Sequence, residues 1–164
     1  MMKIHYRPAE MQDLATIMTI EHSGFTDDEA ATINSMHDRI ERISDTFLEA
    51  VDEQGAILGY IVGPSFNQRY LTDALFDKTV PNKLSDQYQT VLSLVVQPQF
   101  RRFGVASGLL AQLAKVAQQQ GRQAITLTCL KALVPFYERN GYQNEGVSSS
   151  EHAGEVWYNM VLTL

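Results

Sequence analysis

The chain has 164 residues, a length that suits one domain, and we treat residues 1–164 as a single domain. Its 45% hydrophobic and 20% charged residues are typical of a globular protein, and no apolar run reaches the roughly 18 residues that span a bilayer. The formal charge of −6 argues against a nucleic-acid partner, which needs clustered Lys and Arg, and is compatible with a cationic substrate such as an amine.

Two features of the sequence favour a cytoplasmic location. Residues 1–6 lack the apolar stretch of a signal peptide. Cys129 is the only cysteine and cannot form an internal disulfide, so a reducing compartment is the simplest expectation. We therefore expect a cytoplasmic monomer or homodimer with no membrane partner.

The N-terminal third is predicted to contain one strand and two helices. Residues 3–7 alternate in polarity, as a short strand does, and the apolar spacing over 8–24 predicts a helix that ends at a glycine. Thr26 and Glu29 have the spacing of a capping box, in which each side chain accepts from the other residue's backbone N–H. We therefore expect a second helix from Thr26 to about Ile43.

A hairpin and a long irregular segment follow. The runs 46–51 and 56–63 resemble strands and are joined by a short polar turn, which predicts a β-hairpin. Periodicity is lost over residues 64–86, apart from a possible helical turn at 72–76. Long irregular stretches in compact domains are usually functional loops, so we interpret this segment as a lid over a substrate.

The C-terminal half alternates between strands and helices. Residues 90–96 predict a buried strand that Pro98 stops. The remaining predicted elements are a helix at 104–120, a strand at 124–129, a short helix at 133–140, a strand near residue 147 and a last strand at 156–164. This order predicts a mixed α/β fold in two or three layers.

The strongest local signal for chemistry is the turn at residues 101–106, between a predicted buried strand and an amphipathic helix. N–H groups at a helix start lack internal partners and the helix dipole is positive there, so such a turn can bind a pyrophosphate. Gly104 and Ala106 would let the phosphates approach the backbone, and Arg101 and Arg102 add positive charge. The alternative interpretation is an ordinary strand-to-helix turn with two surface arginines.

At this point the chain resembles the GNAT superfamily of N-acetyltransferases. Arg101, Gly104 and Ala106 match its acetyl-CoA motif, and Phe136-Tyr137 followed by Asn140-Gly141-Tyr142 is similar to a later family element. The resemblance covers nearly the whole chain. It implies a central, mostly antiparallel, splayed sheet of about seven strands with about four helices around it, and acetyl-CoA as cosubstrate.

Within the superfamily, the C-terminal half is most similar to the arylalkylamine (serotonin) N-acetyltransferase group and its microbial relatives. Residues 133–139, 146–154, 157–158 and 63–64 carry this likeness. The resemblance implies transfer of the acetyl group to a primary amine of a small molecule, with arylalkylamines and polyamines as candidates. Acetylation of a protein or peptide, and a CoA-binding module without turnover, remain as alternatives.

The resemblance also implies how the cofactor binds. The strand at Leu94–Val96 would splay from the strand near residues 126–129, and the pantetheine arm would pair with backbone in the gap, as an added strand does. The residues implied in cofactor binding are Leu94, Val95, Val96, Arg101, Arg102, Phe103, Gly104, Val105, Ala106, Ser107 and Phe136.

The reaction expected is direct attack of the amine on the thioester. An alkylammonium has a pKa near 10, so neutralising it at pH 7 costs about 4 kcal/mol and the proton needs a route out. The oxyanion needs a donor, for which the resemblance suggests the Val95 or Leu94 amide. Tyr137 occupies the family's general-acid position, where it would protonate the departing thiolate, although a buried structural tyrosine is the plainer interpretation.

The base is less certain, because Thr90 and Leu92 stand where the vertebrate serotonin enzymes have histidines. The remaining candidates are Glu21, Asp86 and His152, and a water chain without a dedicated base is equally compatible.

We expect no metal, since the histidines are widely separated and no CxxC or HxxH pattern occurs. Cys129 lies in an apolar strand and is interpreted as a buried structural residue.

Overall fold

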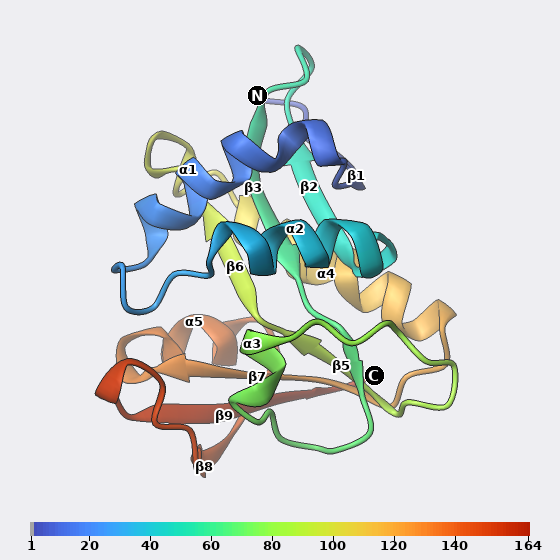
Figure 1. Cartoon of the computed structure of the whole chain (residues 1–164), viewed down its shortest axis with the longest axis vertical. Coiled ribbons are helices and arrows are strands. Elements are labelled where there is room, and N and C mark those ends of the chain that lie inside the picture. Colours follow the sequence, from blue (N-terminus) through green and yellow to red (C-terminus); the bar gives the residue numbers. More distant parts are fainter. Residues whose placement is uncertain (1) are drawn as a thin grey trace.

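The computed structural model describes residues 2–164, in which the strands form two sheets that meet side by side (Figure 1). The first sheet is antiparallel throughout and has the spatial order β1-β2-β3-β6. Its strands are β1 (His5–Pro8), β2 (Phe47–Val51), β3 (Ile57–Val62) and β6 (Ser93–Val96).

The second sheet has the order β4-β5-β7-β9-β8, and only its β5–β7 pair is parallel. Its strands are β4 (Ser65–Phe66), β5 (Tyr88–Val91), β7 (Ala124–Leu130), β8 (Gln143–Val147) and β9 (Trp157–Thr163). The α-helices are α1 (Leu14–Gly24), α2 (Ile33–Arg42), α3 (Ala74–Asp77), α4 (Val105–Gln119) and α5 (Val134–Arg139). Short 3-10 turns lie at Met11–Asp13, Ser44–Thr46, Pro98–Phe100, Lys131–Leu133 and His152–Gly154.

Helices cover both faces of the first sheet. In Figure 1, α1 and α2 lie in front of it and α4 lies behind it. Successive side chains of a strand point to opposite faces. Phe47 and Tyr60 accordingly belong to the core cluster under α1 and α2, whereas Leu48 and Ile61 pack in the cluster with Leu109 of α4. Because both faces are buried, β3 is apolar throughout rather than alternating, and β2 is apolar except for Glu49, which is buried and accepts from Arg7 at 3.0 Å.

The mixed α/β fold and the mostly antiparallel, splayed sheet are confirmed. The two strands beyond the expected seven have simple origins: β4 is only two residues long, and the predicted strand 90–96 is divided between β5 and β6 at Leu92. The Leu92 N–H bonds to the Val62 carbonyl, so the chain leaves the second sheet there and joins the first.

The predicted start of the second helix at Thr26 is wrong. The Thr26 N–H does donate to the Glu29 side chain at 3.0 Å, but the chain makes only a turn there. The Ala31 N–H is held by the Glu21 carboxylate at 2.9 Å, which diverts the chain from a helical path. Helix α2 begins after Thr32, whose hydroxyl accepts from the Ser35 N–H.

Across residues 2–164, no helix combines the length and apolar character needed to cross a membrane.

Candidate active site

A gap opens between the sheets where β6 and β7 separate. Strand β5 pairs with β7 as far as Val91 and Leu127, and beyond that point β6 pairs with β3 instead. The edge of β7 over residues 128–130 therefore has β9 on one side and the gap on the other. The predicted splay between Leu94 and the strand 126–129 is thus present in the fold.

The register of β6 shows which amides face this gap. The Gln97 N–H donates to the Leu58 carbonyl at 2.8 Å, on the β3 side. In an antiparallel ladder the hydrogen-bonding direction alternates along the strand, so the Val95 N–H also points toward β3. The N–H groups of Leu94 and Val96 consequently point into the gap. Of the two expected oxyanion donors, the geometry favours Leu94.

The turn before α4 has the geometry of an anion site. Arg102 and Gly104 have positive φ angles of 72° and 77°, and this reversal aims the first helical amides outward. No side chain caps the helix, and its first turn contains no acidic residue. A Cβ on Gly104 would meet nothing within 4 Å, so the space beside the turn is open. The unpaired amides and the helix dipole can both act on an anion there.

A groove of about 740 Å³ runs from this turn along the gap between the sheets. Every predicted cofactor residue lines it except Phe103, whose side chain is 60% exposed and points elsewhere. Sequence reasoning missed Phe25, Arg139 and Asn140, which also line the groove. Arg139 is exposed and adds a third cation near the two predicted arginines. The sequence feature that could have identified Arg139 is its position two residues after Tyr137 in the same short helix.

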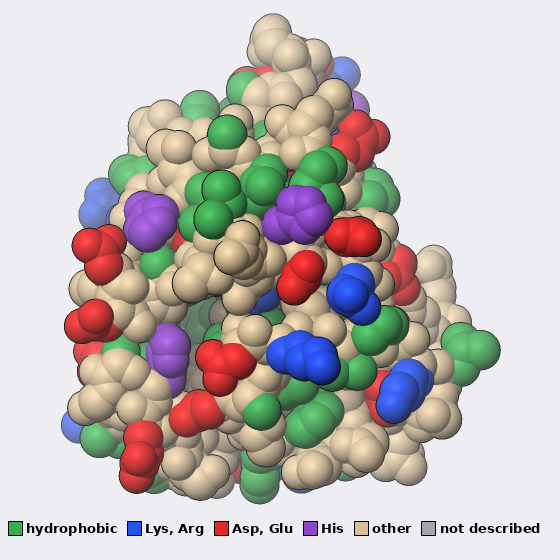
Figure 2. Space-filling view, viewed as in Figure 1, with side chains coloured by type: hydrophobic (Ala, Val, Ile, Leu, Met, Phe, Trp, Pro, Cys, Tyr) green, Lys and Arg blue, Asp and Glu red, His purple; other side chains and the backbone are tan. Residues whose placement is uncertain are grey.

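A second cavity of about 220 Å³ lies on the other side of the gap, beneath α2 and α3. Figure 2 shows its mouth as a hollow in the face below α2. The two spaces meet, since five residues line both: Gly24, Phe25, Leu94, Leu133 and Tyr137. A long ligand in the groove can therefore present its end to a small ligand in the cavity.

Tyr137 lies at this junction and is buried. Its ring is held edge-on by Phe136 and Tyr142, at centroid distances of 5.1 and 5.6 Å. Within residues 2–164 its hydroxyl has no hydrogen-bond partner, so its proton is available to a ligand. Burial, with a smaller contribution from Cys129, raises the pKa of Tyr137 above its usual value. The group is therefore a neutral proton donor at physiological pH.

Glu21, at the end of α1, lines the cavity and is 1% exposed. Its carboxylate accepts from the Tyr60 hydroxyl, from the Ala31 N–H at 2.9 Å and from the Ser93 hydroxyl at 3.3 Å. A carboxylate has about four acceptor positions, so three donors leave room for one more. Glu21 and Ser93 line the same cavity, and Ser93 directly precedes Leu94 of the junction.

The other predicted base, His152, belongs to the cover of the cavity. Its ring stacks on Phe76 of α3, with centroids 5.5 Å apart, and lies 5.8 Å from Trp157. Nearby, the Asp73 carboxylate accepts from the Ser150 hydroxyl at 2.5 Å. The segment 64–86 and the loop that precedes β9 thus meet over the cavity, and His152 is one of the residues that line this cavity.

The remaining candidates have structural contacts. Asp86 lines neither space and accepts from Ser65 at 2.6 Å. Thr90 is buried and donates to the Pro64 carbonyl at 2.7 Å, whereas Leu92 lines the cavity with an apolar side chain. Cys129 is buried, as expected, and burial raises the pKa of its thiol to about 12, which disfavours the thiolate.

One group in the described chain has ligand atoms close enough together for a metal, namely His37, Asp38 and Glu41. It lies on the outer surface of α2 and lines neither space, and exposed acidic groups of this kind are common without a metal.

Comparison with known proteins agrees with this geometry. The family model described as "Acetyltransferase (GNAT) domain" matches residues 15–164. Similar solved structures include Ard1 from Thermoplasma volcanium, with 18% identity, TM-score 0.78 and coverage of 98% of this chain and 97% of that one. A chain of the NatC complex bound to Gag peptide and CoA has 19% identity and a TM-score of 0.76, and the match covers 99% of each chain. The PaiA N-acetyltransferase from Thermoplasma acidophilum in complex with coenzyme A has 16% identity and a TM-score of 0.70, and the match covers 99% of this chain and 100% of that one. At these identities the likeness establishes the fold alone. A comparison with curated protein sequences finds no match.

Proposed function

Because the chain belongs to the GNAT family of acetyltransferases, we propose that it transfers the acetyl group of acetyl-CoA to a primary amine of a small molecule. The observation that carries this proposal is the junction at Leu94 and Tyr137, where the groove for a long ligand meets a small buried cavity. Two similar structures are described as CoA complexes, which supports CoA as the occupant of the groove.

The groove fits acetyl-CoA in its chemistry. The amides at the start of α4, with Arg101 and Arg102, would bind the pyrophosphate. The inward N–H groups of Leu94 and Val96 would pair with the pantetheine amides or the thioester carbonyl. Acetyl-CoA supplies an activated acetyl group, so no residue of the chain needs to be acetylated in the course of the reaction.

We assign one residue of the chain to each step of the transfer. The amine nitrogen forms a bond to the thioester carbon, and the Leu94 amide stabilises the oxygen that gains negative charge. As the carbon–sulfur bond breaks, Tyr137 gives its proton to the thiolate. Glu21 takes the proton that the amine must lose, through the acceptor position that its three donors leave open. Glu21 then releases that proton to solvent, and the second proton, which the nitrogen loses as the amide forms, passes through water to restore Tyr137.

The cover over the cavity favours a small acceptor rather than a peptide. Ligand cavities for drug-sized molecules span about 300–1,000 Å³, and this cavity of about 220 Å³ is smaller and partly covered by α3 and the loop before β9. The arylalkylamine-like subgroup stays a prediction, because the similar structures carry other descriptions.

Thiol release from acetyl-CoA, measured with a panel of amines, tests this function. The panel contains arylalkylamines, polyamines, amino acids and a short peptide. We expect release to depend on one class of small amine and to be absent without it. Release only with the peptide would favour a peptide acetyltransferase, and CoA binding without release on any amine would favour a binding module; either result contradicts the proposal.

A further inference from the structure

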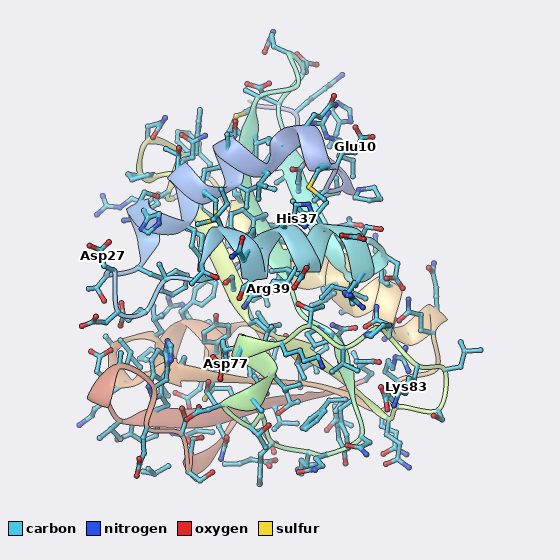
Figure 3. The ribbon with its side chains drawn as sticks, viewed as in Figure 1. Glu10, Asp27, His37, Arg39, Asp77 and Lys83 are labelled. Atoms are coloured by element: carbon cyan, nitrogen blue, oxygen red, sulfur yellow. The ribbon has the colours of Figure 1, made fainter. Side chains whose placement is uncertain are left out.

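A buried arginine without a counter-ion lies in the wall of the acceptor cavity. Arg39 of α2 is 1% exposed and lines the cavity beside Glu21 and Asp77. Figure 3 shows it extending from α2 toward α3, where Asp77 lies. Within residues 2–164 no carboxylate lies within 4.0 Å of its guanidinium.

Most of its hydrogen-bonding capacity is unused. A guanidinium has five N–H donors. Nη2 makes one long contact of 3.5 Å with the Phe76 carbonyl. Nε and Nη1, which carry three of the five donors, have no partner in the described part of the chain and are closed to water. Leaving a buried charge unpaired is costly in free energy, because the charge has lost its hydration and gained no compensating partner. The unpaired guanidinium in the cavity wall is therefore complementary to an anionic group on a ligand.

The local electrostatics agree with this interpretation. Burial lowers the pKa of Arg39, while the nearby Glu21 carboxylate acts in the opposite direction. Glu21 therefore attracts the guanidinium from beyond ion-pair distance rather than neutralising it by contact. The cavity thus has one buried anion and one buried cation, held apart on α1 and α2.

We infer that Arg39 binds a carboxylate of the acceptor, so the acceptor class is small amino acids, with the amine toward Glu21 and the carboxylate toward Arg39. This inference rests on the proposed function and names its substrate class. The carboxylate would replace the Phe76 carbonyl at Nη2 and engage donors that are now unpaired. When the carboxylate binds, Arg39 would lose only its long contact with the Phe76 carbonyl. Phe76 belongs to α3, a helix of four residues, so α3 is the element that would move.

Matched pairs of acceptors test the inference, because an amino acid and its decarboxylated amine differ only in the group that Arg39 would bind. Suitable pairs are tyrosine with tyramine and ornithine with putrescine. A hydrogen bond to a charged group contributes about 1.5–3 kcal/mol, so kcat/KM should favour the amino acid of a pair by about 10- to 100-fold. A preference for the decarboxylated partner in every pair would overturn the inference while leaving the proposed function intact.

Two substitutions on one helix separate recognition from folding. Arg39→Met keeps the side-chain length and removes the charge, a replacement that folded proteins often tolerate. Arg42→Met is the control, since Arg42 is exposed and lines neither cavity. We expect Arg39→Met to reduce the ratio between the partners of a pair to about one, and Arg42→Met to leave it unchanged. Equal losses on both partners in Arg39→Met would indicate a structural role and overturn the inference.

A binding measurement keeps the inference testable without turnover. With CoA present, the N-acetyl derivatives of tyrosine and ornithine, the amino acids of the two pairs, should raise the Tm of the wild type, because a ligand that binds only the folded state stabilises it. The N-acetyl derivative of the matched amine should raise it less. The difference should vanish in Arg39→Met and persist in Arg42→Met. If no amine releases thiol but this difference is present, the proposed function fails and the carboxylate site stands; if the difference is absent, the carboxylate site fails.

Discussion

Replacing Tyr137 by Phe removes one hydroxyl from the junction of the two cavities and leaves the ring in place. The ring is held by Phe136 and Tyr142, and the hydroxyl has no partner within residues 2–164. The free energy of unfolding should therefore change by less than about 1 kcal/mol. General acid catalysis typically contributes about a hundred- to ten-thousand-fold, or roughly 3–5 kcal/mol in the barrier.

The assay should report the chemical step. Single-turnover rates with a good amine are preferable to steady-state turnover, in which product release can conceal a slower chemical step. Acetyl-CoA binding should be nearly unchanged, because the hydroxyl acts mainly as charge develops on sulfur.

Tyr142→Phe is a matched control for this experiment. Its ring lies 5.6 Å from Tyr137, its hydroxyl is also buried without a partner, and it lines neither cavity. We expect it to keep the wild-type rate. The assignment of Tyr137 would be refuted by a Tyr137→Phe rate within about threefold of wild type, since even weak general acid catalysis exceeds that, or by an equal loss in Tyr142→Phe.

Four further predictions follow from the site. Gly104→Glu places a carboxylate beside the phosphates, where repulsion of about 1–3 kcal/mol should weaken acetyl-CoA binding in calorimetry by about 5- to 100-fold. Gly121→Glu is the control, because Gly121 lies at the other end of α4 and has the same φ of 77°. Equal affinities of the two variants for acetyl-CoA would reject the phosphate turn. Glu21→Gln should lower kcat/KM strongly at pH 7 and much less at pH 10, where about half of the amine is already neutral; a loss that is the same at both pH values would exclude proton transfer to Glu21. Because burial raises the pKa of Tyr137, its phenol stays protonated above pH 10. Any loss of rate at alkaline pH below 10 must then come from another group and should also occur in Tyr137→Phe. If that loss of rate is absent from the variant, Tyr137 ionises below pH 10 and this prediction is wrong. Amides of residues 64–86 should exchange faster than those of β7 without ligand and slow when acetyl-CoA and an amine bind; exchange as slow as in β7 without ligand would count against a mobile cover.

The parts of the site that depend on short stretches of sequence could be predicted. The turn at Gly104 needs a residue that tolerates positive φ before an amphipathic helix, and both signals are adjacent in the chain. Tyr137 was named from the family resemblance, and the structure places it where the two spaces meet; its role as general acid stays a prediction. Such features depend on backbone chemistry over a few residues, which the sequence shows directly.

The parts that depend on distant contacts could not be predicted. The start of α2 was placed too early because nothing local reveals that Glu21 holds the Ala31 amide. The division of the strand at Leu92 was missed because an apolar run looks the same in one sheet as in two. Arg39 was overlooked because Met36 and Ile40 mark that face of α2 as core. The sequence does show a cation on the apolar face of α2, but the cavity beside it is assembled from segments that are distant in the chain.

The most direct test of the account is the joint measurement of both products of one reaction. Wild-type protein with acetyl-CoA and the preferred amine from the panel should yield free CoA and N-acetylated amine in a one-to-one ratio, by thiol titration and mass spectrometry. The protein itself should carry no acetyl group at the end, because the attack is direct. CoA release without N-acetylated amine, or acetyl groups that accumulate on the protein instead, would contradict the account.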